Sequence, residues 1–163
     1  PDSYEPDLLG KLTVAQVVSQ DGVVFGPDSS IREVRDWMKQ HETTAKYFAV
    51  ADEHGNYLGT ASLADIYRHD LDPESHIRAI VHHTNIGVKS NDSLRTAVEV
   101  MAGGIEVLPV LSENKVIGVL SYPDIINAYK IDFEANEQAN TQISLKRRRL
   151  KVMLRGKELF KSK

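Results

Sequence analysis

The chain has 163 residues, of which 41% are hydrophobic and 26% are charged. That length suits one domain of ordinary size or two small units with a shared core, and that composition excludes a disordered chain. The absence of cysteine excludes a disulfide framework, a cysteine-ligated zinc site and a thiol nucleophile. No apolar run reaches the roughly 18 residues of a membrane-spanning helix and no signal-peptide pattern is present, so we expect an intracellular location. Because the sequence opens on Pro1 and not on Met, we also expect a segment of a longer protein.

The net charge of −3 hides two oppositely charged regions. Residues 1–145 contain 11 Lys and Arg against 22 Asp and Glu, a net charge of −11. Residues 146–163 contain nine basic residues and one acid, a net charge of +8. The sequence therefore combines an acidic body with a short basic tail.

Hydrophobic periodicity predicts six elements in the first part of the chain. An amphipathic helix is indicated by Ile31, Val34, Trp37 and Met38, which recur at helical spacing. The expected elements are, in order, a helix over 14–18, a strand over 23–25, this helix from 31, two strands around a turn at 52–56, and a helix from Ser62.

The same order returns after a linker over 69–75, in which Asp72-Pro73 disfavours helix. In this second part Leu94, Val98 and Met101 recur at helical spacing. The expected elements are a helix over 77–81, a strand over 86–88, a helix from 94, two strands around a turn at 112–115, and a helix from Ser121.

Residue identities recur together with the elements. Residues 27–32 match 90–95 at a spacing of 63, and residues 59–66 match 118–125 at a spacing of 59. Small insertions in the loops of the first copy explain the change in spacing. The chain therefore contains two tandem copies of one unit. We expect the copies to pack together because neither buries its apolar face alone.

Each copy carries glycine, serine and aspartate at three-residue intervals where its last helix begins. The two sets are Gly59, Ser62 and Asp65, and Gly118, Ser121 and Asp124. A carboxylate can accept hydrogen bonds from both hydroxyls of a ribose, and the start of a helix favours a phosphate. The glycine would let a ligand approach the backbone closely. The serine and aspartate also fit a helix-capping box, and both interpretations stay open because a cap leaves acceptor capacity free.

This order of elements, with the motif complete in both copies, resembles a tandem pair of cystathionine β-synthase (CBS) repeats, the unit called a Bateman module. The resemblance covers residues 11–130 and implies an α+β fold of two α-β-α-β-β-α repeats packed with pseudo-twofold symmetry. It divides the chain into a first repeat at 11–68, the linker at 69–75, a second repeat at 76–130, and a polar linker with the basic tail at 131–163. It implies a regulatory module that binds adenosine ligands such as AMP, ADP, ATP or S-adenosylmethionine between the copies, without a required cofactor, and that pairs into a homodimer.

The resemblance also implies that the aspartate of one copy faces the first two strands of the other. One cleft would then combine residues of the second copy with residues of the first, namely Ser121 and Asp124 with Val23, Lys46, Tyr47 and Ala49. A second cleft would combine Ser62 and Asp65 with Ile86, Glu106, Val107 and Pro109.

The two clefts are expected to differ in charge. Lys46 could meet a phosphate, whereas Glu106 at the equivalent position would repel one. We therefore expect the Asp124 cleft to favour charged nucleotides, and the Asp65 cleft to stay empty or to accept adenosine or a cationic ligand. Lys46 as a solvated charge at a strand edge is the alternative. Ala49 stands where the family commonly has proline, which puts the adenine contact of the preferred cleft in doubt.

Residues 7–14, 48–55 and 61–66 resemble the cytoplasmic C-terminal region of bacterial ClC-type chloride channels or transporters. This second resemblance implies a transmembrane transport domain attached to the module and a place on the cytoplasmic side of the inner membrane, with the module soluble when excised. The alternatives are a regulatory region of a CorC-type metal transporter, a stand-alone CBS protein, and a ligand-free structural dimerisation module.

The basic tail carries apolar residues at helical spacing, namely Leu150, Met153, Leu154, Leu159 and Phe160. This pattern predicts a basic amphipathic helix, which suits either an acidic protein surface or an anionic membrane. The absence of interleaved Tyr or Trp and of any recognised motif argues against nucleic-acid binding.

Nothing in the sequence indicates an enzyme or a metal site. The six histidines form no i, i+4 pair with a matching ligand set. There is no Gly-x-Ser-x-Gly elbow and no P-loop. We therefore expect neither catalytic residues nor metal ligands.

Overall fold

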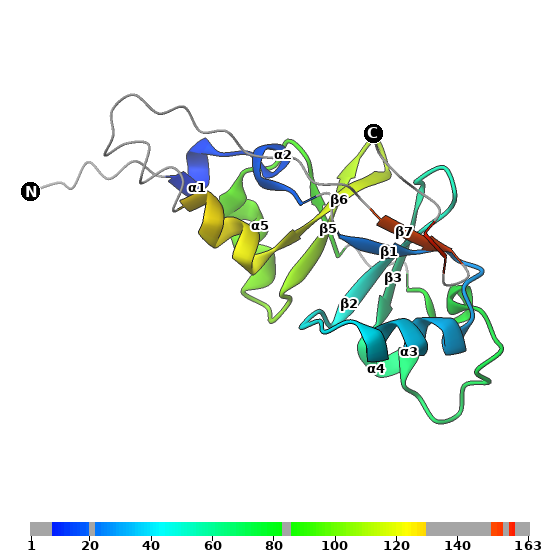
Figure 1. Cartoon of the computed structure of the whole chain (residues 1–163). Helices are drawn as coiled ribbons and strands as arrows, with labels where there is room; N and C mark the ends of the chain where they lie inside the picture. Colours follow the sequence, from blue (N-terminus) through cyan, green and yellow to red (C-terminus); the bar gives the residue numbers. More distant parts are fainter. Residues whose placement is uncertain (1–7, 20–21, 83–85, 130–150, 155–156, 159–163) are drawn as a thin grey trace, which may run out of the picture.

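The computed structural model describes residues 8–19, 22–82, 86–129, 151–154 and 157–158, and it contains two sheets, one built on each copy of the repeat (Figure 1). The elements of the first copy are α1 (Leu8–Lys11), α2 (Val14–Val17), β1 (Val23–Phe25), α3 (Ile31–Gln40), β2 (Tyr47–Ala51), β3 (Tyr57–Ser62) and α4 (Leu63–Ile66). The elements of the second are the 3₁₀ helix η1 (Ile77–Ile80), β4 (Val88–Lys89), α5 (Leu94–Met101), β5 (Val107–Ser112), β6 (Lys115–Ser121) and a helix over 122–129. The α+β fold and the order of elements predicted for each copy are confirmed.

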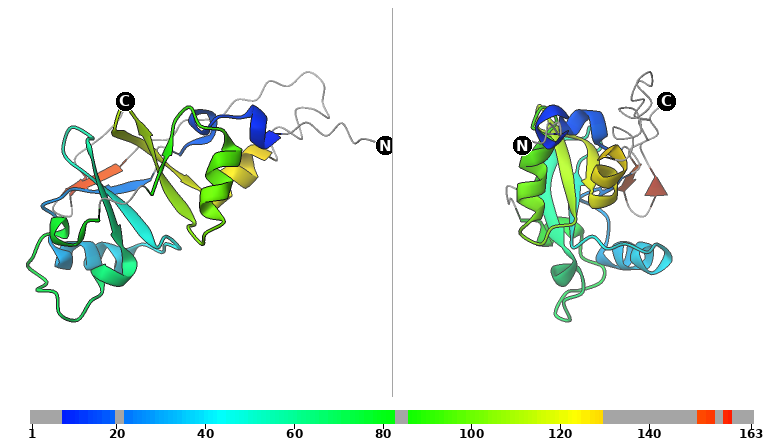
Figure 2. Two further views of the ribbon diagram at one scale, coloured as in Figure 1. Left: turned by 180° about the vertical axis from the view of Figure 1, so that it is seen from behind. Right: turned by 90° about the vertical axis from the view of Figure 1, so that its left-hand side faces the viewer.

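The three strands that each copy contributes have the same topology, although the first sheet has five strands and the second has three. In the first, β2 pairs in parallel with β1 and antiparallel with β3; in the second, β5 pairs in parallel with β4 and antiparallel with β6. The hairpin turns of the copies meet, because Tyr57 N donates to Asn114 O at 2.9 Å and Val116 N donates to Gly55 O at 2.9 Å. Seen from behind, the two sheets lie side by side with helices flanking them (Figure 2).

The opening helix of each copy packs on the other copy. Val14 N donates to Asp92 O at 2.8 Å, and Ile77 N donates to Ser29 O at 2.8 Å. The two bonds are equivalent, because residue 77 corresponds to residue 14 and residue 92 corresponds to residue 29 at the repeat spacing of 63. Each is formed between the copies, as pseudo-twofold symmetry requires. Figure 1 shows α1 and α2 beside α5, far from the rest of their own copy. The spatial halves therefore exchange their first helices, which the repeat pattern alone did not indicate.

The exchange is visible in the composition of the hydrophobic cores. One core contains Phe25, Ile31, Phe48 and Ile66 of the first copy together with Ile77 and Ile80 of η1. The other contains Val88, Leu94, Leu108 and Leu120 of the second copy together with Val14 and Val17 of α2. A third cluster joins the sheets through Val24, Ala49, Ala51, Val116 and Val119. Since each core needs a helix from the other copy, we expect neither copy to fold well alone.

Serine caps fix where the long helices begin. Ser30 Oγ accepts from Glu33 N at 3.0 Å, and Glu33 Oε1 accepts from Ser30 N at 3.1 Å, which is a complete capping box. Ser93 Oγ accepts from Thr96 N at 3.3 Å without the reciprocal bond to an acid. The same serine cap thus starts the equivalent helix in both copies, with a reciprocal backbone bond in the first and a 3.3 Å contact between Ser93 Oγ and Thr96 Oγ1 in the second.

The expected helix of the basic tail is wrong over the part that the structure describes. Residues Lys151–Leu154 form strand β7, which pairs in parallel with β1, and Lys157–Glu158 form β8, antiparallel to β7. Gly156 disfavours a helix there, and a short helix is marginal in water without tertiary support. The free edge of β1 instead offers backbone partners to an extended segment. The remainder of the predicted helix, including Leu159 and Phe160, lies outside the described residues.

Candidate functional site

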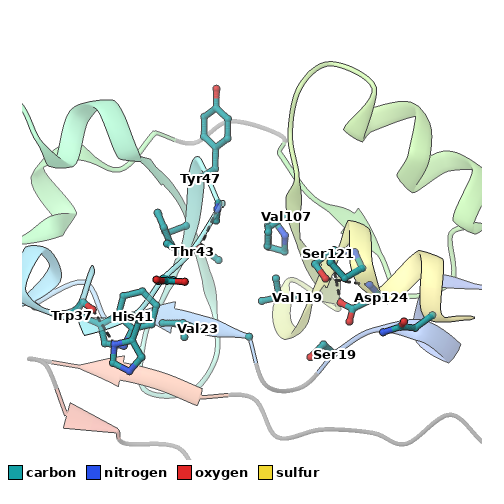
Figure 3. Close-up of a pocket in the computed structure, with 18 residues that line it drawn as sticks. Ser19, Val23, Trp37, His41, Thr43, Tyr47, Val107, Val119, Ser121 and Asp124 are labelled. Carbon is teal, nitrogen blue, oxygen red and sulfur yellow. Dashed lines mark hydrogen bonds between the residues drawn. The ribbon is translucent and has the colours of Figure 1, made fainter. Parts of the chain in front are cut away.

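A cavity of about 420 Å³ lies between the two copies (Figure 3). Strands β1 and β2, with α3 and the segment after it, form one side, while β5, β6 and the helix over 122–129 form the other. The residues that line it are Ser19, Gly22, Val23, Trp37, His41, Glu42, Thr43, Ala45, Tyr47, Phe48, Ala49, Val107, Pro109, Val119, Ser121, Pro123, Asp124 and Asn127. Its size falls within the range of pockets that hold small organic ligands, and its wall mixes apolar with polar groups in the usual way.

Ser121 and Asp124 stand where the helix over 122–129 begins. Asp124 Oδ2 accepts from Ser121 N at 2.9 Å, and Ser121 Oγ accepts from Asp124 N at 3.3 Å. The capping box expected from the sequence is therefore present. Within the described part of the chain, Asp124 Oδ1 makes no hydrogen bond, so the cap leaves this oxygen available to a ligand, as Figure 3 shows for the side chain beside the cavity.

The opposite wall is aromatic. The Trp37 and His41 rings stack with centroids 4.5 Å apart and planes 10° from parallel, and His41 Nδ1 lies 2.9 Å from Trp37 O. The rings of Trp37 and Phe25 also pack edge to face, with centroids 5.5 Å apart. The sequence pattern placed Trp37 on the core face of α3 and did not assign it to a site. The signal that could have found it is the pair itself, a lone tryptophan with a histidine four residues later at the end of a helix.

Five of the six residues predicted for this cleft line the cavity, and Lys46 does not. Lys46 is exposed and lines a separate open hollow with Tyr47, Ser62, Leu63, Ala64 and Tyr67. Its carbonyl accepts from Leu63 N at 2.8 Å, which holds it against the start of α4. Lys46 therefore does not line the Asp124 cavity in this structure, and its contact with a phosphate stays a prediction. The titratable residues that do line the cavity are His41, Glu42, Tyr47 and Asp124, with no lysine or arginine among its lining residues.

Two cavities lined by described residues each contain part of the set predicted for the second cleft. Val107 and Pro109 line the first cavity, and Ser62 lines the hollow with Lys46. Glu106 is exposed, and its carbonyl accepts from Tyr122 N at 3.2 Å. The carbonyl of Ile86 accepts from the Tyr57 hydroxyl at 3.1 Å, and burial raises the pKa of Tyr57 to about 12.

Asp65 has protein partners. Its Oδ2 lies 2.8 Å from His82 Nε2, and its Oδ1 lies 3.7 Å from Arg68 Nη1. Ser62 Oγ accepts from Asp65 N at 3.1 Å, so this aspartate also sits at a capped helix start. The hydrogen bond to His82 is the main cause that lowers the pKa of Asp65, with smaller contributions from Ser62 and Arg68.

Protein atoms lie close to the position that a Cβ would take on each of the two motif glycines. A Cβ on Gly118 would lie 2.5 Å from Val18 Cγ2 and 2.7 Å from Ser19 O. A Cβ on Gly59, whose φ is +135°, would lie 2.5 Å from His82 O. In both copies the segment after the exchanged helix lies against the glycine, so protein makes the close approach in the direction of the missing Cβ. The approach of a ligand to this backbone stays a prediction.

Comparison with known proteins identifies this architecture. Residues 77–131 match the family model of the CBS domain. The chain also resembles many solved structures, among them a CBS domain pair/ACT domain protein from Thermotoga maritima, with a TM-score of 0.61 and 24% identity over 80% of this chain and 100% of that one. The fold is that of a CBS domain pair. A search of the curated proteins found no match.

Two further solved structures with this fold come from transport proteins. The CBS pair domain of a putative Mg²⁺ transporter from Shewanella oneidensis has a TM-score of 0.64 and 16% identity over 78% of this chain and 77% of that one. The cytosolic domain of the Mg²⁺ channel MgtE in complex with ATP has a TM-score of 0.57 and 23% identity over 68% of this chain and 46% of that one. These likenesses establish the fold of the pair.

Among the described residues, no group of three or more His, Asp or Glu side chains is arranged to hold a metal ion. No helix in the same part of the chain has the length and apolar character to cross a membrane.

Proposed function

We propose that this CBS pair is a regulatory module that binds an adenosine nucleotide in the cavity between its two copies. The observation that carries the proposal is the position of Asp124, whose Oδ1 is available beside a cavity of about 420 Å³ with an aromatic and aliphatic opposite wall. One carboxylate beside such a wall matches a nucleoside, which offers a ribose edge and a flat base.

The charge of the cavity favours a ligand with little negative charge. Glu42 and Asp124 line it, and lysine and arginine do not. Because Lys46 lies outside, the preference for highly charged nucleotides expected from the sequence loses its support. The first backbone N–H groups of the helix over 122–129 are engaged, because Tyr122 N donates to Glu106 O and Asp124 N donates to Ser121 Oγ, and Pro123 has none. Only the helix dipole then favours a phosphate there. We expect AMP or adenosine to bind more tightly than ATP.

A titration with substituted proteins tests the proposal. Asp124→Ala is expected to weaken AMP binding at least tenfold, because a charged acceptor for the ribose hydroxyls is lost. Asp65→Ala is the matched control, since it removes the equivalent carboxylate from the other copy and is expected to leave AMP binding unchanged. Isothermal titration calorimetry measures both, and AMP should also raise the melting temperature of the parent chain.

Two results would contradict the proposal. The first is the absence of a thermal shift and of binding heat with adenosine, AMP, ADP, ATP and S-adenosylmethionine alike, which would favour the ligand-free structural module. The second is equal loss of affinity in both aspartate variants, which would place the ligand elsewhere.

We further propose that the module regulates an attached membrane transport domain from the cytoplasmic side of the inner membrane. Support comes from the two relatives above that belong to Mg²⁺ transporters. A chloride-channel parent rests on the three sequence segments 7–14, 48–55 and 61–66 alone, and a CorC-type metal transporter is the alternative.

We also propose that the chain forms a homodimer through paired modules and that its basic tail contacts protein or anionic lipid. Sedimentation of the chain with and without AMP, and vesicle binding with and without phosphatidylserine, test these two parts.

A further inference from the structure

The two aspartates of the repeat lie beside equivalent backbone segments, and the side chain at one position of these segments differs in what it contacts. Ser19 N donates to Val119 O at 3.0 Å and Val119 N donates back to Ser19 O at 2.9 Å. Thr60 N donates to His82 O at 3.0 Å and His82 N donates back to Thr60 O at 2.9 Å. Since Ser19 precedes His82 by 63 residues and Thr60 precedes Val119 by 59, these are the same pair of bonds in the two copies. Ser19 therefore occupies, beside Asp124, the position that His82 occupies beside Asp65.

The side chains at this equivalent position differ in reach. Ser19 lines the cavity with Asp124, as Figure 3 shows, and its short side chain leaves the cavity open. The His82 imidazole instead extends to Asp65, with Nε2 at 2.8 Å from Oδ2. Arg68 approaches the other oxygen of Asp65 at 3.7 Å. Both carboxylate oxygens of Asp65 thus face cationic or hydrogen-bonding protein groups, whereas Asp124 keeps Oδ1 open.

We propose that the residue at position 19 or 82 decides which aspartate binds the nucleoside. His82 contacts the oxygen of Asp65 that would otherwise bind a ribose, as Asp124 does in the first cavity. The inference rests on the proposed function of the Asp124 cavity and deepens it. It predicts one nucleotide per chain, and it makes His82 a residue that sets the number of sites. The His82 side chain keeps 60% of its surface exposed, so it can be replaced without opening a core.

The decisive experiment exchanges the two side chains in the full chain. Calorimetric titration with AMP counts the sites, while fluorescence of Trp37, the only tryptophan of the chain, reports the first cavity alone because Trp37 lines it. The equivalent position in the second copy is Val100, which gives no such signal. The variants are His82→Ser, Ser19→His, and His82→Ser combined with Asp65→Ala. His54→Ser is the matched control, because His54 is also an exposed histidine 3.6 Å from a carboxylate oxygen, that of Glu53.

The parent and His54→Ser are expected to bind one AMP with a tryptophan signal. His82→Ser should bind a second AMP without a second tryptophan signal, at least about fivefold more tightly than any second event in the parent, which is the equivalent of the roughly 1 kcal/mol of an exposed ion pair. Adding Asp65→Ala should remove that second event. Ser19→His should weaken the first event by about fivefold or more.

The outcomes separate the two levels of the proposal. No AMP binding by the parent or any variant contradicts the proposed function, and the inference with it. One site in the parent and still one in His82→Ser overturns the inference and leaves the proposed function standing. Two equal sites in the parent overturn it as well. If Ser19→His lowers the melting temperature so far that it does not fold, the His82→Ser titration alone decides.

Discussion

The first and second copies share their local chemistry and differ in what the other copy places beside it. Ser62 and Ser121 both cap the last helix, and Asp65 and Asp124 both follow three residues later. The difference comes from positions 19 and 82, where serine leaves a cavity open and histidine binds the carboxylate. Position 37 adds an aromatic wall to one side, and its counterpart Val100 does not. A repeated motif therefore indicates a repeated fold, and under our proposal the residue brought from the other copy decides which motif binds a ligand.

The largest effect that tests this comparison concerns the motif glycines. Gly59→Ala would place a Cβ against His82 O in a backbone with positive φ, and we expect a loss of about 2–5 kcal/mol of unfolding free energy from overpacking and strain combined. Gly118→Ala adds the contact with Ser19 O without such a φ, so about 1–3 kcal/mol is expected. Urea denaturation measures both.

Gly55→Ala is the control for the glycine comparison. Its φ is +84°, but nothing lies within 4 Å of the added Cβ, so it tests conformational strain without a clash and should cost about 1–2 kcal/mol. If Gly59→Ala cost no more than Gly55→Ala, the close approach of the exchanged segment would not be the reason for the glycine.

A smaller effect distinguishes the caps of the two long helices. Ser30→Ala breaks a complete capping box and should cost about 1–2 kcal/mol. Ser93→Ala removes the bond from Thr96 N and a contact with the Thr96 hydroxyl, and it should cost about 0.5–1 kcal/mol. Glu33→Ala is expected to reduce the difference, because it removes the bond that Ser30 has and Ser93 lacks. Equal costs for the two serines would show that the reciprocal bond contributes nothing.

The smallest effect is a pH dependence that belongs to Asp65. Hydrogen bonding to His82 lowers the pKa of this carboxyl in the folded state, so its contribution is present above the ordinary aspartate pKa of about 3.9 and is lost as pH falls through the lower folded value. The unfolding free energy of the parent should therefore exceed that of Asp65→Asn at pH 6, by about 1 kcal/mol or less, and the difference should shrink as the pH falls below the ordinary aspartate pKa of about 3.9. A difference that stays constant from pH 6 to pH 2 would contradict the assignment.

Much of the fold could be predicted because its signals are local. Helical spacing of Ile31 and Val34, the serine at each helix start and the turn residues act over a few positions, and the repeat confirmed them twice. The helix predicted for the tail failed for a related reason. Apolar spacing at Met153 and Leu154 carries no information on the free edge of β1, with which this segment pairs.

By itself the sequence determined the two copies, their order of elements, the capped helix starts and the Asp124 side of the cavity. Only the tertiary structure decided that α2 and η1 exchange places, that Lys46 lies outside the cavity, that Trp37 and His41 form its wall, and that His82 reaches Asp65. Each of these depends on groups that are distant in sequence and meet across the pseudo-twofold axis or the sheet edge. Periodicity and spacing describe a segment's own faces, whereas a binding site depends on which face of another segment is packed against them.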